Sequence, residues 1–147
     1  MAWSAAANAI GVPQSADGVD SHQFSARANA FVETPEVQIA TCPLVENGAI
    51  LVLSLPSYGR KGGLPIQRVR EQLRAACAVL DHMFWPDDIS LRDRTLVDFG
   101  RVQGHHQITD LYLLALAVHR GGCLASFDQA IALSSGPGGQ AQHLRLL

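Results

Sequence analysis

The stretch "ITDLYLLALAVHRGGCLASFD" (residues 108–128) places an acid at the end of each of its two most apolar segments. We expect a helix over about residues 110–120, with Thr109 as its N-cap and the two glycines that follow as its end. "CLASF" is expected to form a strand that runs into Asp128. Leucines occur on almost every side of the helix, which predicts burial on more than one side. Asp110 and Asp128 therefore stand at the ends of buried elements, a placement that calls for a chemical explanation.

The composition is that of a folded domain. The chain has 147 residues, of which 48% are hydrophobic and 16% charged, so it can bury a core of useful size. Its formal net charge is −2, which excludes overall basicity. Nucleic-acid binding would therefore have to use a local basic patch or metal ions. We expect a single domain over residues 1–147.

Cysteine usage favours a reducing compartment. Cys42, Cys77 and Cys123 lie in apolar sequence without metal-ligand or paired spacing, so we expect reduced, buried thiols in a cytoplasmic protein. The sequence after Met1 lacks a basic segment followed by an apolar stretch, and a secretory signal is not expected. The apolar run at residues 47–59 is interrupted by Pro56 and is too short to span a bilayer, so we expect no membrane association.

Helix and strand patterns alternate along the chain. Hydrophobic spacing predicts helices near residues 22–34, 43–53, 64–80 and 91–99, and short apolar runs predict strands or extended segments at 37–41, 81–90 and 143–147. This alternation indicates an α/β fold with a central parallel sheet flanked by helices. Residues 1–20 are rich in Ala, Ser, Gly and Asp and show little periodicity, so they are the atypical part of the domain.

Three acids are expected where parallel strands end and helices begin. Glu46 falls in the first turn of the helix after "VQIAT", Asp110 in the first turn of its own helix, and Asp128 after "CLASF". In a parallel α/β sheet, ligands bind at the carboxyl ends of the strands. Clusters of carboxylate oxygens suit Mg²⁺ or Mn²⁺. Taken singly, each acid is also ordinary helix-start or turn chemistry, so the combination carries the interpretation.

The same stretch resembles the carboxyl-terminal motif of PIN-domain ribonucleases of the VapC toxin type. In that motif, Thr-Asp opens a helix rich in Leu and Ala, small residues turn the chain, and a strand ends in Phe-Asp. "ATCPLVENGAILVLS" (residues 40–54) is similar to the family's middle motif. "HMFWPDDISL" and "GHHQ" resemble the branch of the family abundant in mycobacteria. The similarity begins at about Asp20 and covers most of the chain, with motifs that are specific in combination.

The resemblance implies a PIN-like fold and a metal-dependent endoribonuclease, the toxin component of a type II toxin–antitoxin system. Glu46, Asp110 and Asp128 match the family's second, third and fourth acidic positions. They are thus the implied catalytic residues and ligands of Mg²⁺ or Mn²⁺, with Thr109 orienting Asp110. The implied partners are RNA, a VapB-like antitoxin and a second copy of the chain in a homodimer.

The chain departs from the family at the first motif. There the family carries Leu-Asp-x-Asn on an apolar strand, and the aspartate is a primary metal ligand. The segment "SAAANAI" falls over this motif, so that Asn8 keeps the asparagine as a supporting residue while Ala6 takes the aspartate's place. Asp17 or Asp20 could substitute for the missing acid, although both stand in turn-like sequence. The loss of one of four carboxylates is expected to weaken metal binding and reduce activity.

Basic and aromatic residues offer RNA contacts. Arg60 and Lys61 lie in a glycine-rich loop and are candidates for an RNA backbone. For the arginines at positions 68, 70 and 74 we favour a solvated helix face, and for His105 and His106 simple exposure. The "MFW" sequence at residues 83–85 could stack on a base, but we favour a strand near the core.

Two other functions remain open from the sequence. The first is a catalytically inactive PIN-like protein that still binds an antitoxin, which the missing first aspartate favours. The second is a phosphohydrolase of small phosphate esters, which is less favoured because no phosphate-cradling glycine loop precedes a helix.

Overall fold

The structure is a computed structural model that describes residues 20–35, 37–57, 63–102, 104–129, 131, 133 and 139–147. The described residues up to Pro86 form one compact unit, the amino-terminal unit. Those from Asp87 to Leu146 form a second, the carboxyl-terminal unit. The predictions for Ala6, Asn8, Arg60 and Lys61 concern residues outside the described ranges.

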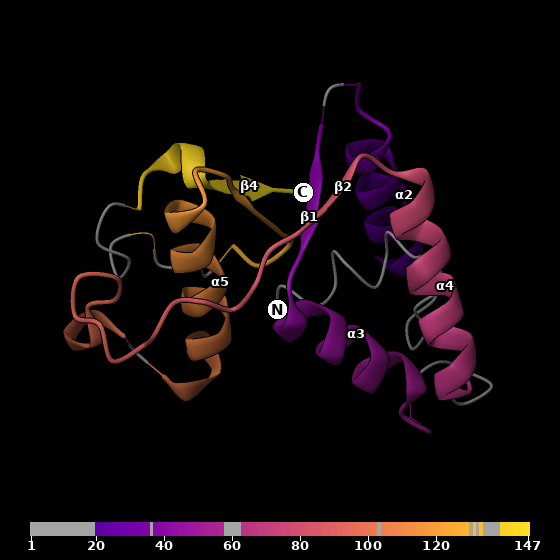
Figure 1. Cartoon of the computed structure of the whole chain (residues 1–147), viewed down its shortest axis with the longest axis horizontal. Coiled ribbons are helices and arrows are strands. Elements are labelled where there is room, and N and C mark those ends of the chain that lie inside the picture. The colour runs from indigo at the N-terminus through magenta and orange to yellow at the C-terminus, as the bar shows by residue number, and fades with distance from the viewer. Residues whose placement is uncertain are drawn as a thin grey trace. The chain divides into compact units, whose positions relative to one another are not determined.

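The amino-terminal unit pairs two parallel strands across a helical crossover (Figure 1). Its elements are α2 (Asp20–Val32), β1 (Ile39–Thr41), α3 (Pro43–Ser54), α4 (Ile66–Val79) and β2 (His82–Phe84). β1 and β2 align Ile39 with His82 and Thr41 with Phe84. Because parallel strands cannot be joined by a tight hairpin, the α3 and α4 helices together supply the connection.

The contact between α3 and α4 forms the core of this unit. Leu53 of α3 and Val69 of α4 are fully buried, and Ile50 and Leu64 pack against them. The chain returns from the loop so closely that the Leu64 N–H donates to the Leu53 carbonyl, at 2.9 Å. A Cβ on Gly63 would overlap the backbone of the last α3 turn, so this close approach requires glycine.

The carboxyl-terminal unit is built around one buried helix. Its elements are the 3₁₀ turns η1 (Phe99–Arg101), η2 (His105–Gln107) and η4 (Ala141–His143), the helix α5 (Ile108–His119), and the parallel strands β3 (Leu124–Ser126) and β4 (Leu144–Leu146). α5 contacts β3, η2 and η4. Arg120 follows the helix, and Gly121 then takes a φ of 69°, the left-handed conformation that ends helices.

Apolar burial holds α5 in place. The helix carries seven buried residues: Asp110, Leu111, Leu113, Leu114, Ala115, Leu116 and Ala117. Leu111 and Ala115 form a cluster with Val97, against which Ile89 and Leu91 also pack. The prediction of burial on more than one side is confirmed.

Most of the expected elements are present. The α/β class with parallel strands is confirmed, as are the four helices expected near residues 22–34, 43–53, 64–80 and 110–120. Within the described residues, the strands form two separate parallel pairs. None of the described helices combines the length and the hydrophobicity that crossing a bilayer requires.

The helix expected over residues 91–99 is wrong. The Asp93 carboxylate accepts hydrogen bonds from the Thr95 backbone N–H, at 2.9 Å, and from its hydroxyl, at 2.7 Å. The Asp98 carboxylate likewise accepts from the Gly100 N–H, at 3.0 Å. Aspartates that bond to the backbone two residues ahead stabilise turns in competition with helix. The hydrogen bonds from Thr95 also lower the pKa of the Asp93 carboxyl.

Two predictions of burial are also corrected. Cys42 is buried as expected, but Cys77 is half-buried and Cys123 is exposed on the turn after α5. Met83 and Phe84 have 42% and 52% of their surface exposed, so the preference for a strand near the core is wrong there. A three-residue strand that begins with a half-buried histidine leaves its next two side chains in solvent.

We predict that Gly63→Ala lowers the free energy of unfolding by about 1–3 kcal/mol, because the added Cβ forces the α3–α4 contact apart. Urea unfolding followed by circular dichroism measures this change. Ala75→Ser on the exposed face of α4 is the control and should cost no more than about 0.5 kcal/mol. Equal stability of Gly63→Ala and the parent chain would mean that the close approach at residue 63 is not required.

Candidate metal-binding and catalytic site

Glu46 is placed by the junction of β1 and α3. Pro43 occupies the first helical position, where its missing N–H leaves no bond unmade, and Glu46 lies in the first turn. The Glu46 N–H donates to the carbonyl of Cys42 at 3.0 Å. The carboxylate is fixed as well, because the hydroxyl of Thr41 donates to Glu46 Oε1 at 2.6 Å. The sequence prediction that Glu46 opens the helix after a strand is confirmed.

His82 extends this contact into the neighbouring strand. Its Nε2 lies 2.8 Å from the Thr41 Oγ1. Thr41 is buried and His82 half-buried, so both hydrogen bonds are partly shielded from water. Thr41, Glu46 and His82 thus form a hydrogen-bonded chain. Sequence reasoning assigned no role to Thr41 or His82, although each lies within a motif that resembles the family.

The negative charge of Glu46 affects the pKa of a thiol on α4. Burial raises the pKa of Cys77, and the negative charge of Glu46 raises it further. Both effects act in the same direction, because each disfavours the thiolate. Cys77 therefore reports the charge state of Glu46 from the facing helix.

Asp110 lies in the first turn of α5 and is 6% exposed. The prediction that Thr109 caps the helix is wrong, because α5 begins at Ile108 and Gln107 occupies the N-cap position without a side-chain cap. An N-cap residue needs non-helical backbone angles, whereas η2 leads directly into α5 and Thr109 is already helical. The burial of Asp110 within an apolar helix is the notable electrostatic feature of this unit, since a buried carboxylate is costly unless it is compensated.

Asp128 follows β3, as predicted. Its backbone N–H donates to the hydroxyl of Ser126 at 3.0 Å, and Ser126 is fully buried at the end of the strand. A buried side chain thereby fixes the backbone of the acid. Asp110 and Asp128 belong to the carboxyl-terminal unit, on α5 and just after the strand that α5 contacts. Glu46 belongs to the amino-terminal unit, together with Thr41 and His82.

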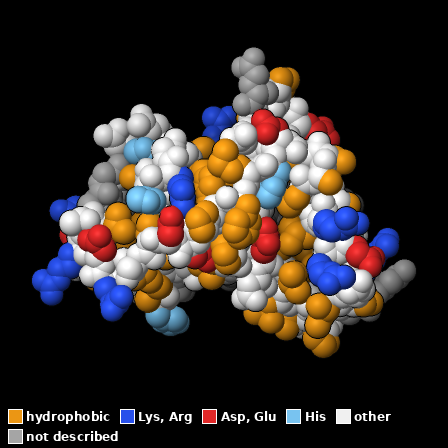
Figure 2. Space-filling view, in the orientation of Figure 1, with side chains coloured by type: hydrophobic (Ala, Val, Ile, Leu, Met, Phe, Trp, Pro, Cys, Tyr) orange, Lys and Arg blue, Asp and Glu red, His pale blue; other side chains and the backbone are white. Residues whose placement is uncertain are grey.

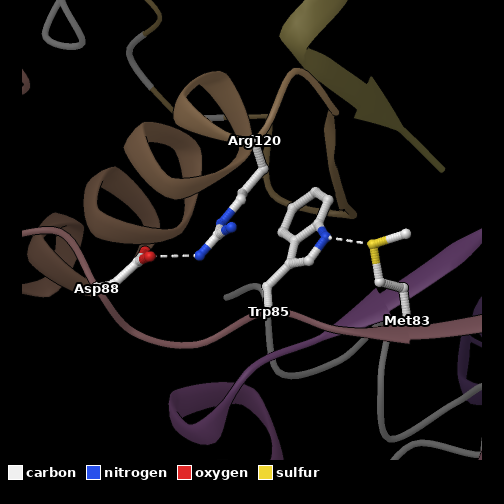
Figure 3. Close-up of polar contacts among 4 residues, drawn as sticks. All are labelled: Met83, Trp85, Asp88 and Arg120. Carbon is white, nitrogen blue, oxygen red and sulfur yellow. Dashed lines mark hydrogen bonds and ion pairs between the residues drawn. The ribbon is translucent and has the colours of Figure 1, made fainter.

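Other polar contacts lie beside the "HMFWPDD" motif (Figure 3). The indole N–H of Trp85 donates to the sulfur of Met83 at 3.0 Å. A guanidinium N–H of Arg120 donates to the carboxylate of Asp88, forming an ion pair. Both residues belong to the carboxyl-terminal unit, where this bond ties the end of α5 to the first residues of the unit.

Basic side chains gather over α4, as Figure 2 shows. The arginines at positions 68, 70 and 74 are exposed, so the expected solvated helix face is confirmed. His105 is exposed as well.

The donor chemistry of the three acids fits a hard divalent cation, because all three supply carboxylate oxygen. Among the residues that the structure describes, no group of three or more His, Cys, Asp or Glu side chains is arranged to hold a metal ion. The match to Mg²⁺ or Mn²⁺ therefore rests on the chemistry of the donors.

The fold and its acids together define a class of protein. It is an α/β protein in which carboxylates follow parallel strands or lie in the first turn of helices. No family model matches the chain. Among curated proteins, it is 37% identical over 128 residues to ribonuclease VapC44 of Mycobacterium tuberculosis, an alignment covering 86% of this chain and 88% of the relative. It is also 37% identical to ribonuclease VapC38 of that organism, over 76% of this chain and 77% of the relative. For ribonuclease VapC39, the identity is 36% over 67% and 70% of the two chains.

With such identities over most of both chains, the protein belongs to the VapC ribonuclease family. This confirms the resemblance drawn from the sequence motifs. At the level of the family, it also confirms the endoribonuclease and toxin–antitoxin assignment. The comparisons lend no support to the alternative of a catalytically inactive relative.

We predict that Glu46→Gln speeds the alkylation of Cys77 at pH values below the pKa of the Cys77 thiol. Loss of the Glu46 charge lowers the pKa of Cys77, which increases the thiolate fraction at a given pH. The measurement is the rate of reaction with iodoacetamide between pH 7 and 9, in a chain carrying Cys42→Ser and Cys123→Ser so that only Cys77 reports. Glu71→Gln, on the exposed face of the same helix as Cys77, is the control and should leave the rate unchanged. An unaltered rate in Glu46→Gln would rule out the electrostatic contact.

Proposed function

We propose that this protein is a metal-dependent endoribonuclease and the toxin component of a toxin–antitoxin pair. Membership of the VapC ribonuclease family supports this proposal most directly. The positions of Asp110 in the first turn of α5 and of Asp128 just after β3 support it further, because ligands bind at the carboxyl ends of parallel strands in α/β folds. Small-ester phosphohydrolysis gains no support from these relatives.

In this proposal, Glu46, Asp110 and Asp128 hold Mg²⁺ or Mn²⁺. The ion, when bound, supplies charge neutralisation at the scissile phosphate and a lower pKa for the attacking water. The three carboxylates would supply oxygen ligands, and their negative charge would offset that of the cation. Asn8 is the proposed supporting residue of the first motif.

The surroundings of each acid limit the movement of its side chain or its backbone. Glu46 is held by the Thr41 hydroxyl, Asp110 by the rigid α5 helix, and the Asp128 backbone by buried Ser126. Ligands fixed in this way bind a metal with less entropic cost than ligands on flexible segments. Arg60 and Lys61 are the proposed contacts for the RNA backbone.

The proposed partners and location follow from the family. We infer a VapB-like antitoxin, an RNA substrate, a homodimeric state and a cytoplasmic location. Size-exclusion chromatography with light scattering tests the homodimer, and co-purification with a co-expressed VapB-like protein tests the antitoxin.

We predict that Asp110→Asn reduces Mg²⁺-dependent RNA cleavage by about 100-fold or more while the fold is kept, because the amide cannot supply a charged ligand. Initial rates on a panel of structured RNAs measure the effect, and EDTA should abolish cleavage by the parent chain. The control is Asp93→Asn in an exposed turn, which keeps the side-chain oxygen that accepts from Thr95. Parent-like cleavage by Asp110→Asn would remove the acid from the mechanism.

We also predict that Ala6→Asp raises the Mg²⁺-dependent cleavage rate, because it restores the family's first carboxylate. Ala7→Asp is the matched control, since it adds the same charge one position away. Equal rates for Ala6→Asp and the parent chain would show that three carboxylates suffice or that the first motif aligns elsewhere.

A further inference from the structure

We propose that His82 is a positioning residue for the metal ligand Glu46 and that it acts through the hydroxyl of Thr41. The inference rests on the proposed function, in which Glu46 binds the ion. It assigns two residues, on two strands, to the support of one carboxylate.

Strand register brings His82 and Thr41 to one face of the parallel pair. His82 lies opposite Ile39, and Thr41 is two residues beyond Ile39. Because side chains alternate between the two faces of a strand, Ile39 and Thr41 point to the same face. His82 is therefore the diagonal neighbour of Thr41, and its ring spans the gap to place Nε2 2.8 Å from Oγ1.

Proton counting sets the direction of the two hydrogen bonds. A threonine hydroxyl has one proton, and in this structure Glu46 Oε1 accepts it at 2.6 Å. The second bond can then form only if Nε2 of His82 carries a proton and donates it to the oxygen of Thr41. His82 thereby restricts the rotation of the Thr41 hydroxyl and leaves its proton directed at Glu46.

The arrangement matters for a flexible ligand. A glutamate side chain has three rotatable bonds, and fixing them costs conformational entropy each time the ion binds. A carboxylate held by a charge-assisted hydrogen bond has already lost part of this entropy in the free protein, so less is lost when the ion binds. Residues that orient a ligand in this way typically change metal affinity by about 10- to 100-fold when they are replaced.

The experiment is a Mn²⁺ titration of the full chain, with free Mn²⁺ followed by electron paramagnetic resonance. Thr41→Val keeps the shape of the side chain and removes the hydroxyl, whereas Thr41→Ser keeps the hydroxyl and removes the methyl group. We expect Thr41→Val to weaken Mn²⁺ binding about tenfold and Thr41→Ser to remain within about twofold of the parent. If Thr41 served packing alone, Thr41→Ser would be the more impaired of the two, and that ranking overturns the proposal.

A second pair of variants tests His82 itself. His82→Gln retains an N–H donor and should stay within about threefold of the parent affinity, whereas His82→Leu should lose about tenfold. His119→Gln, on an exposed histidine, is the control and should have no effect. Circular dichroism checks the fold of each variant, and the Thr41 pair decides the outcome if His82→Leu does not fold. Equal affinities of His82→Leu, Thr41→Val and the parent overturn the proposal.

Glu46→Gln separates this inference from the function on which it rests. If the parent binds Mn²⁺ and Glu46→Gln does not, the metal site stands and the other variants judge His82 and Thr41 alone. If the parent does not bind Mn²⁺, or Glu46→Gln binds it equally well, Glu46 is not a ligand and both proposals fall.

Discussion

Parallel pairing of short strands is the constraint on which the placement of the acids depends. Two parallel strands need a crossover between them, so β1 must be followed by a helix before the chain can return to β2. Glu46 opens that helix within a few residues of the strand end. The same rule separates β3 from β4, and Asp128 follows β3 directly. Chemistry at the carboxyl ends of strands is thus a consequence of the connectivity.

The two units hold their acids by different means. In the amino-terminal unit, a hydrogen-bonded chain from His82 through Thr41 fixes the Glu46 carboxylate. In the carboxyl-terminal unit, the apolar burial of α5 fixes the backbone that carries Asp110. Hydrogen bonding gives directional control of a flexible glutamate, whereas burial gives rigidity to a short aspartate close to the main chain.

Local signals predicted the elements well, and long-range pairing limited the rest. Pro43, the leucines of α5 and the glycines after it mark helix ends through chemistry that acts within one turn. The Thr109 cap failed because η2 extends the helix by residues with no apolar signal, and the segment at 91–99 failed because Asp93 bonds within its own turn. The contact between His82 and Thr41 depends on strand register across 41 residues, which no local pattern encodes. Family resemblance supplied the proposed roles of the acids, which spacing alone left open.

The exposed thiol of Cys123 has a consequence for handling the protein. It lies on the surface turn after α5, while Cys42 is buried and Cys77 is half-buried. Air oxidation therefore joins two molecules most readily at Cys123. Such a disulfide-linked pair has the mass of a homodimer but need not have its interface. Measurements of molecular mass in solution therefore require a dithiol reductant in the buffer.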